Sequence, residues 1–449
     1  MKNYDVIVVG GSAAGFTAAI TAKRHYPHRK VLLVRKEEKV SIPCGIPYIF
    51  GTVGFPEKNL IPDGPLKNNG IDFLVEEVTG IDAENRVVEI AKGEKYGYER
   101  LVLATGSTPI VPPIPGVDKE NIFCVQKDVD YLNNVLDAVD SGSDLAIVGC
   151  GFIGVEFAEE IKKRKPDLNV KIVEMLTNCL QLVFDEEFCI KAEEALKKQG
   201  IELLLDERVE KLLGNKKLEG VKLSSGREIK ADVALMGIGA AASIDLAKKA
   251  GLEIGPTKSI QVNRYMQTSN DHIFACGDCA EKVSFFDGKP SGLKLASIAS
   301  MEARIVGANL FGPRRMNMGV IGAFSTILGN TAFAAAGLTE TAARQEGYIL
   351  AVGESEAVNR HPGVMPGGEN LKVKLIFEAG SLVLVGGQVS GARSGGELIN
   401  AISACIYQRM TADDIATFQM ATHPALSASP IAYQLSNAAE IAIANVRRL

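Results

Sequence analysis

Short apolar runs recur along the chain, and two of them are each followed by a glycine-rich turn and then by a predicted helix, which is made of small residues after the first turn and spans Val155–Arg164 after the second. The first run is Val6–Val9, and it leads through the turn Gly10–Gly15 into Phe16–Lys23. The second run is Leu145–Val148, which leads into the turn Gly149–Gly154. An apolar run that ends in glycines predicts a buried strand, and the small residues after it predict a helix. Each segment therefore predicts a strand, a tight turn and a helix.

Both turns have the composition of a site for a dinucleotide pyrophosphate. The backbone N–H groups and the positive dipole end of the following helix bind such a group, and small residues let it approach. The candidate cofactor-binding residues are the three key positions of each turn, namely Gly10, Ser12 and Gly15 in the first and Gly149, Gly151 and Gly154 in the second. One turn of this kind is a weak signal, but two in one chain predict two bound dinucleotides.

The residue that ends the next strand indicates which nucleotide each turn binds. Glu174 follows Val170–Val173, at the place where an acid accepts both hydroxyls of an adenine ribose, and its charge would repel the 2′-phosphate of NADPH. The second turn therefore favours NADH. After the first turn the same place holds Arg35, so that Glu37, Glu38 or a different contact would have to hold the ribose.

Two further strands end in small or acidic residues, and with them the chain resembles a known family. They are Leu101–Pro109, which contains Ala-Thr-Gly, and Ile273–Asp278, which ends in Gly-Asp. Over nearly its whole length the chain resembles the FAD- and NAD-dependent pyridine nucleotide-disulfide oxidoreductases. The resemblance implies that Thr105, Gly106 and Asp278 belong to the FAD site.

The same resemblance predicts the fold class and the domains. We expect an α/β protein with two Rossmann-like dinucleotide-binding domains, one for FAD and one for NAD, and a C-terminal α+β dimerisation domain. The expected segments are 1–112 (FAD, first part), 113–245 (NAD(P)H), 246–320 (FAD, second part) and 321–449 (dimerisation). Apolar strands at Leu371–Phe377 and Leu382–Gly386 suit a homodimer interface, and in the family this domain lends residues to the partner's active site.

Composition narrows the choice of partners. The chain has 449 residues, 46% of them hydrophobic, with 49 basic and 54 acidic residues, so a net charge of −5 gives no electrostatic case for nucleic acid. We expect no N-terminal signal, because the first strand begins near Tyr4, and no apolar run approaches the roughly 20 residues that span a bilayer. We expect a cytoplasmic protein with small-molecule partners and no membrane contact.

Cys44, in Ser41–Tyr48, is the candidate catalytic residue among the eight cysteines. In the dithiol enzymes of the family a second cysteine stands five positions later, and here that position is Ile49. The chain therefore resembles the single-cysteine branch of coenzyme A-disulfide reductases, NADH oxidases, NADH peroxidases and persulfide reductases. In that branch the cysteine lies near the flavin and reacts as a thiolate, the form that attacks sulfur or oxygen.

The other cysteines lack metal-ligand spacings, so no metal site is expected, and most of them suit buried apolar positions. Cys276 and Cys279 have CxxC spacing, for which a redox disulfide is one interpretation. The residues between them are Gly277 and Asp278, which the resemblance already assigns to the flavin.

Departures from the family pattern bear on the substrate. Ala13 stands where NADH peroxidases and many oxidases have a histidine, which disfavours peroxidase chemistry. The segments that carry tyrosines in coenzyme A-disulfide reductases here read His361–Gly367 and Thr422–Ala425, without a tyrosine. His423 resembles the acid/base histidine of glutathione reductases, but Ala428 replaces its orienting glutamate, so a structural role competes with a catalytic one. For His361 we expect a structural role.

These observations predict an FAD-dependent NAD(P)H oxidoreductase that reduces coenzyme A persulfide, polysulfide or coenzyme A disulfide through Cys44, with His423 from the partner subunit as candidate proton donor. A persulfide demands less of a proton donor, because hydrosulfide is a better leaving group than an alkyl thiolate. An NADH oxidase that reduces O2 to water or peroxide is the alternative, and a flavin reductase for a protein such as rubredoxin is a third class, against which Cys44 argues. Coenzyme A is a further candidate cofactor, which Lys23, Arg24 and Arg29 could contact.

Overall fold

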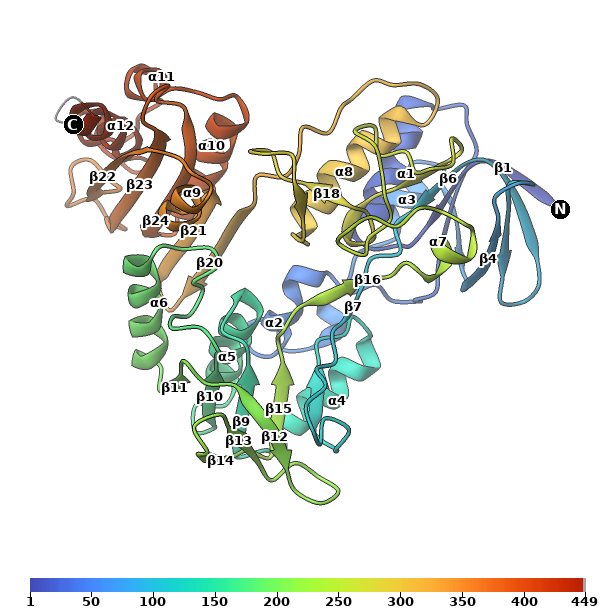
Figure 1. Cartoon of the computed structure of the whole chain (residues 1–449), viewed down its shortest axis with the longest axis horizontal. Coiled ribbons are helices and arrows are strands. Elements are labelled where there is room, and N and C mark those ends of the chain that lie inside the picture. Colours follow the sequence, from blue (N-terminus) through green and yellow to red (C-terminus); the bar gives the residue numbers. More distant parts are fainter. Residues whose placement is uncertain (447–449) are drawn as a thin grey trace. The chain divides into compact units, whose positions relative to one another are not determined.

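The computed structural model describes residues 1–446, and these fall into two compact units (Figure 1). Unit 1 comprises Met1–Pro112, Phe123–Ser141 and Ile238–Val320, and unit 2 comprises Pro113–Ile122, Gly142–Gly237 and the chain from Ile321 onward. Of the three predicted boundaries, those at 112 and 320 coincide with breaks between units, whereas the one at 245 does not, and 123–141 and 238–245 belong to unit 1. The assignment of segments to cofactors stays a prediction, and 447–449 of the expected dimerisation segment lie outside the described residues.

Unit 1 is built on a sheet with the strand order β3-β2-β1-β6-β5-β4, in which β17 also pairs with β6. The strands are β1 (Lys2–Val9), β2 (Val31–Arg35), β3 (Asp72–Val75), β4 (Val78–Asp82), β5 (Val87–Ile90), β6 (Lys95–Leu103) and β17 (Ile273–Ala275). Strands β3, β2, β1, β6 and β17 run parallel, with Val9 beside Leu103 and Leu103 beside Ala275. Their carboxyl ends therefore meet at one edge, where α/β sheets bind ligands.

Small residues let two helices of unit 1 pack closely. Helix α1 (Ala13–His25) follows the first glycine turn and packs against α8 (Ala296–Asn309). A Cβ atom on Gly307 would lie 2.6 Å from the Cβ of Thr21, so only glycine allows this approach. The remaining elements around unit 1 are η1 (Pro43–Gly45), α2 (Ile46–Ile49), η2 (Pro56–Lys58), α3 (Gly64–Asn68), β7 (Ser107–Pro109), α4 (Val129–Ser141), β16 (Ala240–Ala242), α7 (Asp245–Lys249), η3 (Gly277–Cys279), β18 (Lys282–Val283) and β19 (Pro290–Ser291), while β8 (Ile122–Cys124) begins at the unit boundary.

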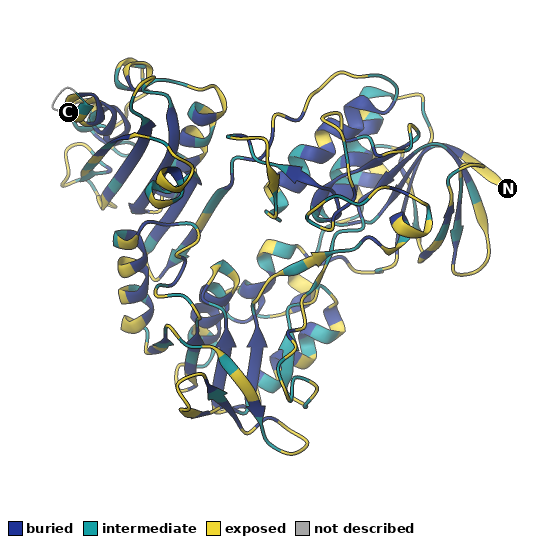
Figure 2. Ribbon diagram, viewed as in Figure 1, coloured by how far each residue is buried: buried dark blue, intermediate teal, exposed yellow. Residues whose placement is uncertain are grey.

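Unit 2 contains a second parallel sheet, in which β11, β10, β9 and β15 lie side by side. These strands are β11 (Ile201–Leu204), β10 (Asn169–Val173), β9 (Asp144–Val148) and β15 (Val233–Met236), with helices α5 (Phe152–Arg164) and α6 (Glu186–Lys198) and an antiparallel sheet of β12 (Val209–Leu213), β13 (Gly220–Leu223) and β14 (Glu228–Lys230). The apolar strands are buried, as Figure 2 shows. Two Rossmann-like sheets, each with a glycine turn after its central strand, confirm the predicted α/β fold class.

The C-terminal part of unit 2 is an antiparallel sheet with helices, which confirms the expected α+β architecture. Its order is β20-β21-β24-β23-β22, with β20 (Ala323–Leu328), β21 (Thr331–Gly337), β22 (Leu350–Val358), β23 (Asn370–Glu378), β24 (Leu384–Gly391), α9 (Glu340–Gln345), α10 (Gly395–Tyr407), α11 (Ala412–Thr417), η4 (Pro430–Ala432) and α12 (Gln434–Val446). Strand β23 contains the predicted strand 371–377, and β24 begins two residues after the predicted start at 382. In residues 1–446 no helix combines the length and the apolar character needed to cross a membrane.

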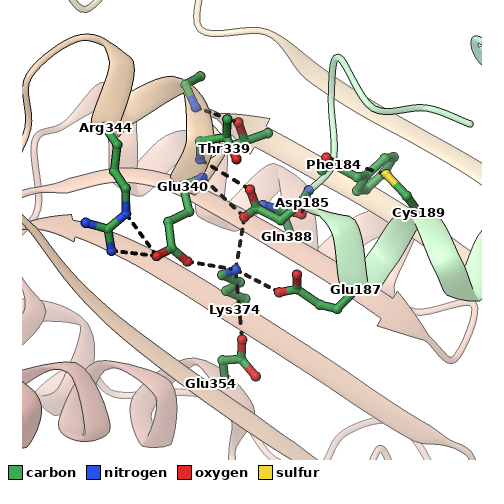
Figure 3. A network of polar contacts seen from close by, with 12 residues as sticks. Phe184, Asp185, Glu187, Cys189, Thr339, Glu340, Arg344, Glu354, Lys374 and Gln388 are labelled. Carbon is green, nitrogen blue, oxygen red and sulfur yellow. Dashed lines mark hydrogen bonds and ion pairs between the residues drawn. The ribbon is translucent and has the colours of Figure 1, made fainter. Parts of the chain in front are cut away.

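A buried lysine joins helix α6 to the C-terminal sheet (Figure 3). The Nζ atom of Lys374, on β23, lies 3.0 Å from Oδ2 of Asp185, 2.7 Å from Oε1 of Glu187 and 3.1 Å from Oε2 of Glu340. Gln388 Nε2 donates a hydrogen bond to the same Asp185 oxygen at 2.6 Å. The side chain of Lys374 is only 4% exposed, so surrounding carboxylates must compensate its charge.

Acidic residues of helix α5 face the first strand of the C-terminal sheet. Thr326 Oγ1 donates to Glu156 Oε1 at 2.9 Å, and the Gly329 N–H donates to Glu159 Oε2 at 3.0 Å. Burial raises the pKa of Glu156 to about 7, and the charges of Glu160 and Glu159 add to this effect while the Thr326 hydroxyl opposes it. Above neutral pH Glu156 is therefore ionised while buried, and this lowers the stability of the contact between α5 and β20.

Glu156→Gln is expected to stabilise the protein at alkaline pH. The pKa of Glu156 is higher in the folded chain than in the unfolded chain. The protonated carboxyl therefore makes its full contribution to the unfolding free energy below about pH 4.5, and this contribution is lost as the pH rises through about 7. Gln keeps an acceptor for Thr326 and does not ionise. At pH 8 the unfolding free energy of the variant should therefore exceed that of the wild type by up to about 3 kcal/mol, and its melting temperature should be higher. Near pH 4.5 the two melting temperatures should be equal. Differential scanning fluorimetry from pH 4.5 to 8.5 measures this. The control is the exposed Glu186→Gln, and equal shifts for both variants would contradict the account.

Candidate functional site

Cys44 lies in a short turn on the surface of unit 1. The turn is η1 (Pro43–Gly45), and it runs directly into the four-residue helix α2 (Ile46–Ile49). Cys44 is exposed, whereas Ile46 and Ile49 behind it are almost completely buried. The chain thus presents this sulfur to solvent from an apolar base.

Buried Asn59 holds the Cys44 turn in place. Its Nδ2 donates to the carbonyl of Ile42 at 2.9 Å, and the Ile42 N–H donates to the Asn59 carbonyl at 2.9 Å. A Cβ atom on Gly45 would lie 2.0 Å from Asn59 Oδ1, so glycine is required beside the cysteine. No sequence motif pointed to Asn59, because the contact joins segments that are separate along the chain.

The first glycine turn is tightly packed and leads into a helix N-terminus that no side chain of the described residues caps. Gly10 has φ +112°, and a Cβ atom there would lie 2.1 Å from the Ala104 carbonyl oxygen. A Cβ on Gly15 would lie 1.9 Å from the Gly10 oxygen. Ser12 is the N-cap residue, and within the described chain its side chain makes no capping hydrogen bond. The first N–H groups of α1 therefore remain available to an anion, as a dinucleotide pyrophosphate requires.

The basic residue at the end of β2 is neutralised by a partner that the sequence did not indicate. Arg35 is 3% exposed, and its guanidinium donates to both carboxylate oxygens of Asp63, at 2.6 and 3.0 Å. Of the acids considered from the sequence, Glu38 contacts Arg35 through its backbone carbonyl, at 3.0 Å. A Cβ on Gly11 would lie 2.5 Å from Arg35 Cδ, so the arginine stem lies against the glycine turn.

Thr105, Gly106 and Asp278 lie at the strand-end edge of unit 1, where β6 and β17 end beside β1. Ser107 Oγ donates to Asp278 Oδ2 at 2.7 Å, which links the two strand ends. Thr105 Oγ1 donates to the Ser243 carbonyl at 2.7 Å, and the Ser243 N–H donates to the Gly106 carbonyl at 2.9 Å. The structure therefore brings together the segments that the resemblance assigned to FAD.

A buried ion pair fixes the turn that contains Asp278. The Gly277 N–H donates to Glu302 Oε2 at 2.8 Å, and Lys282 Nζ donates to the Gly277 carbonyl at 2.6 Å and lies 3.5 Å from the same Glu302 oxygen. Burial raises the pKa of Glu302 to about 7, although Lys282 and the Gly277 N–H oppose this. Among the described residues Glu302 Oε1 has no hydrogen-bond partner. Gly277 has φ +78°, and a Cβ there would lie 2.8 Å from the Cβ of Ala14 on α1.

The CxxC pair of the same turn is buried. Cys276 and Cys279 are thiols and are 0% exposed, and Cys279 Sγ lies 3.4 Å from the Leu103 carbonyl oxygen. Burial raises the pKa of both thiols, which opposes formation of a thiolate. This environment favours the structural interpretation of the pair over the redox one.

The second glycine turn repeats the geometry of the first. Gly149 has φ +103°, and a Cβ on Gly154 would lie 1.9 Å from the Gly149 carbonyl oxygen. Gly151 is the N-cap residue of α5, and in the described chain no atom lies within 4 Å of the place where its Cβ would be. The turn thus combines close internal packing with open space in front of the helix N-terminus.

Glu174 lies beside this second turn, as its spacing predicted. Its Oε2 accepts from the Cys150 N–H at 2.7 Å, and its Oε1 accepts from the Leu176 N–H at 3.0 Å. Glu174 is half-buried, so each carboxylate oxygen is held by the backbone and keeps acceptor capacity for a further donor. This arrangement suits an acid that binds ribose hydroxyls.

A disulfide joins Cys150 and Cys179, with a Cα–Cα distance of 4.9 Å. Cys150 is the residue between Gly149 and Gly151, and Cys179 lies in the segment after β10. Sequence reasoning expected most cysteines to be buried apolar residues and missed this bond. The two positions are 29 residues apart and match no cysteine motif, so spacing alone carried no signal.

His423 is exposed in a loop of the C-terminal part of unit 2. The Ala425 N–H donates to His423 Nδ1 at 3.2 Å, and the His423 N–H donates to Ser427 Oγ at 3.0 Å. An acceptor Nδ1 places the proton of the neutral imidazole on Nε2. The His361 N–H donates to the Pro424 carbonyl at 3.3 Å, so both histidine loops meet here.

Two family models match the chain. The model described as pyridine nucleotide-disulphide oxidoreductase covers residues 4–303, and the dimerisation domain of the same family covers residues 323–431. These matches agree with the two Rossmann-like sheets and with the C-terminal sheet.

Related proteins carry names from both the oxidase and the sulfur reductase groups. An NADH oxidase from Methanocaldococcus jannaschii is 30% identical over 94% of this chain and 95% of its own length. An NAD(P)H sulfur oxidoreductase (CoA-dependent) from Pyrococcus furiosus is 32% identical over 87% of this chain and 89% of its own. The structure of an NAD-dependent persulfide reductase from A. fulgidus superposes with a TM-score of 0.90 at 28% identity, covering 99% of this chain and 84% of that one. With the family model matched over residues 4–303, this chain belongs to the pyridine nucleotide-disulphide oxidoreductase family.

Proposed function

We propose that this chain is an FAD-dependent NAD(P)H oxidoreductase that reduces coenzyme A persulfide, polysulfide or coenzyme A disulfide through Cys44. The observation that carries the proposal is the Cys44 turn, in which an exposed cysteine lies on a turn held by Asn59 and Ile49 occupies the place of the second cysteine of dithiol enzymes. The names of the P. furiosus sulfur oxidoreductase and the A. fulgidus persulfide reductase support a sulfur substrate.

Family membership implies FAD and NAD(P)H as cofactors, and we assign the first cradle to FAD. Gly10, Ser12 and Gly15 would hold the pyrophosphate, because the Ser12 side chain does not cap the α1 N-terminus behind them. Thr105, Gly106 and Asp278 would contact the ribityl and phosphate groups from the neighbouring strand ends. The bond between Ser107 and Asp278 supports this assignment, because it fixes the carboxylate at that edge.

We assign the second cradle to the nicotinamide dinucleotide. Gly149, Gly151 and Gly154 would hold its pyrophosphate, and Glu174 would accept the hydroxyls of the adenine ribose. The carboxylate would repel a 2′-phosphate, so the site favours NADH over NADPH. The backbone donors that hold Glu174 support this role, because they orient the carboxylate before a ligand arrives.

The chemistry at Cys44 follows from thiolate reactivity. The thiolate attacks one sulfur of the substrate, so a new S–S bond forms on Cys44 and hydrosulfide or a thiolate departs. When bound, FAD and NAD(P)H would supply the two electrons that reduce the S–S bond on Cys44. The sulfur held there would then leave as a thiol or hydrosulfide with a proton, and the Cys44 thiolate would be restored. Asn59 and Gly45 keep the turn fixed throughout.

His423 of the partner subunit is our candidate donor of the proton to the departing sulfur. Donation requires the imidazolium, so the hydrogen bond from the Ala425 N–H to Nδ1 would open when the ring takes up its proton. Exposed apolar residues on the same part of unit 2 support a homodimer that would cover them, with Val364 89%, Leu426 74% and Ile431 87% exposed. We propose coenzyme A as a substrate component on the strength of the relatives' names alone.

NADH oxidase activity is the second candidate function, and the name of the M. jannaschii relative favours it. In that reaction Cys44 would cycle through a sulfenic acid, and water or peroxide would be the product. Ala13 carries no side-chain proton donor in the first glycine turn, which supports sulfur chemistry over peroxidase chemistry.

Cys44→Ser should abolish sulfur reduction and spare the cofactors. The assay is anaerobic NADH oxidation by the FAD-loaded protein with coenzyme A persulfide, with hydrosulfide release measured in parallel and oxygen consumption under air as reference. The wild type should turn over persulfide well above its oxygen rate, and the variant should lose this activity by roughly three orders of magnitude. Cys405→Ser, on helix α10, is the matched control. Turnover only under air would assign the protein to the oxidases instead.

Gly277→Ala should weaken FAD binding. The new methyl group would clash with Ala14 and force an unfavourable φ, which costs about 1–3 kcal/mol and displaces Asp278. We expect FAD affinity, measured by fluorescence titration of the apoprotein, to fall about tenfold or more. Gly288→Ala is the control, since Gly288 has a similar φ of +71° and, among the described residues, no atom within 4 Å of the added methyl. Equal losses in both variants would remove Gly277 from the FAD site.

His423→Asn separates the catalytic role from the structural one. A lost proton donor should lower kcat for coenzyme A disulfide by about 100-fold, because an alkyl thiolate needs the proton, and by much less for the persulfide. Steady-state assays with both substrates from pH 6 to 9 measure this, with His361→Asn as control. A uniform loss for both substrates would show that His423 is structural.

A further inference from the structure

The disulfide between Cys150 and Cys179 closes a loop that contains helix α5, strand β10 and Glu174. One of its cysteines is part of the second glycine turn, and the other belongs to the segment that follows the ribose acid. Both residues are buried, at 1% and 0% exposed. The bond thus ties the two halves of the candidate dinucleotide site to each other.

Cys150 also holds the neighbouring groups through its backbone. Its N–H donates to Glu174 Oε2 at 2.7 Å, and its carbonyl accepts from the Leu180 N–H at 2.9 Å. Cys150 therefore contacts the segment 174–180 at the acid, at Cys179 and at Leu180. A displacement of this segment relative to the turn would move the Glu174 carboxylate as well.

The segment has an exposed side and a buried one. Glu193 Oε1 accepts from the Cys179 N–H and from Asn178 Nδ2, each at 3.1 Å. Met175 is 63% exposed and Leu182 is 84% exposed, whereas Leu180 and Phe184 are buried. Reduction of the disulfide would leave hydrogen bonds as the main constraint on residues 175–179, which precede these buried side chains, and a loop released from a crosslink gains conformational entropy.

We propose that the Cys150–Cys179 pair is a reversible redox site that positions Glu174 for the nicotinamide dinucleotide. With the bond closed the ribose acid is held in place, and with the bond open the segment 175–179 loosens and the dinucleotide binds more weakly. The exposed residues Thr177, Gln181 and Leu182 flank Cys179, so local opening of the segment brings its sulfur to solvent.

The chemistry is thiol–disulfide exchange with a low-molecular-weight disulfide as oxidant. One cysteine thiolate attacks the oxidant, forms a mixed disulfide and releases one small thiol, and the second cysteine then displaces the other small thiol and closes the protein bond. The two cysteines lose two electrons and two protons, and the oxidant leaves as two thiols. A small dithiol reverses the reaction. If the proposed function holds, the oxidant belongs to the class of compounds that the enzyme consumes, so substrate would keep the dinucleotide site assembled.

The test compares oxidised and reduced holoenzyme with ADP-ribose as probe, because ADP-ribose has the adenine ribose and cannot transfer a hydride. Protein loaded with FAD is treated with glutathione disulfide or with dithiothreitol and then desalted, and mass spectrometry of alkylated peptides reports the state of Cys150 and Cys179. Calorimetry should show ADP-ribose binding about tenfold more weakly to the reduced protein. With ferricyanide as acceptor, the KM for NADH should rise on reduction while kcat is retained.

Variants separate this effect from Cys44 and from folding. Both measurements are repeated in Cys44→Ser protein, and neither requires sulfur-substrate reduction, so failure of the proposed function would leave the test intact. Cys179→Ser should show the weak affinity under both treatments, whereas Cys405→Ser should respond as the wild type does. Equal affinities in two states that mass spectrometry proves different would overturn the proposal. So would a bond that dithiothreitol never opens in the folded protein, or two cysteines that are alkylated after oxidant treatment.

Discussion

The close backbone contact between Gly10 and Ala104 is the constraint on which the candidate FAD site depends. The Ala104 carbonyl oxygen occupies the space of a side chain at Gly10, and the Gly10 carbonyl occupies that space at Gly15. These contacts let β1 and β6 end at the same level and let α1 begin beside them with its N–H groups open. The second sheet repeats the device with Gly149 and Gly154. A cradle of this kind follows from the absence of Cβ atoms more than from any polar side chain.

Local sequence signals sufficed wherever the structure is built from consecutive residues. The strand–turn–helix segments at Gly10–Gly15 and Gly149–Gly154 could be predicted from apolar runs and glycine spacing, and Glu174 from its distance along the chain. The same reasoning could not find Asn59, Asp63 or Glu302, since each acts on a segment that is distant in sequence, and without Glu302 it had no reason to single out Lys282. The disulfide escaped for the same reason, because only the fold brings Cys179 to Cys150.

Buried charges mark the places where the protein fixes a turn or a helix at some energetic cost. Lys282 and Glu302 enclose the Gly277 turn, Arg35 and Asp63 lie under the first cradle, and Lys374 meets the N-terminus of α6. Such pairs add little net stability, because desolvation offsets most of their attraction, but removing one partner leaves an uncompensated charge. Their value is therefore geometric, since each permits only one arrangement of the backbone it contacts.

Cysteine residues of this chain lie in opposite environments. Cys276 and Cys279 are buried at a strand end, where burial raises their pKa and keeps them as inert thiols. Cys44 is exposed on a turn whose glycine and asparagine leave its backbone no alternative position. Reactivity toward sulfur requires both access and thiolate character, so environment separates these cysteines where residue type cannot. Cys150 and Cys179 are buried like Cys276 and Cys279 but lie next to an exposed segment. Access of a small molecule to their sulfurs therefore depends on local opening of this segment, which distinguishes them from both a core thiol and a surface thiol.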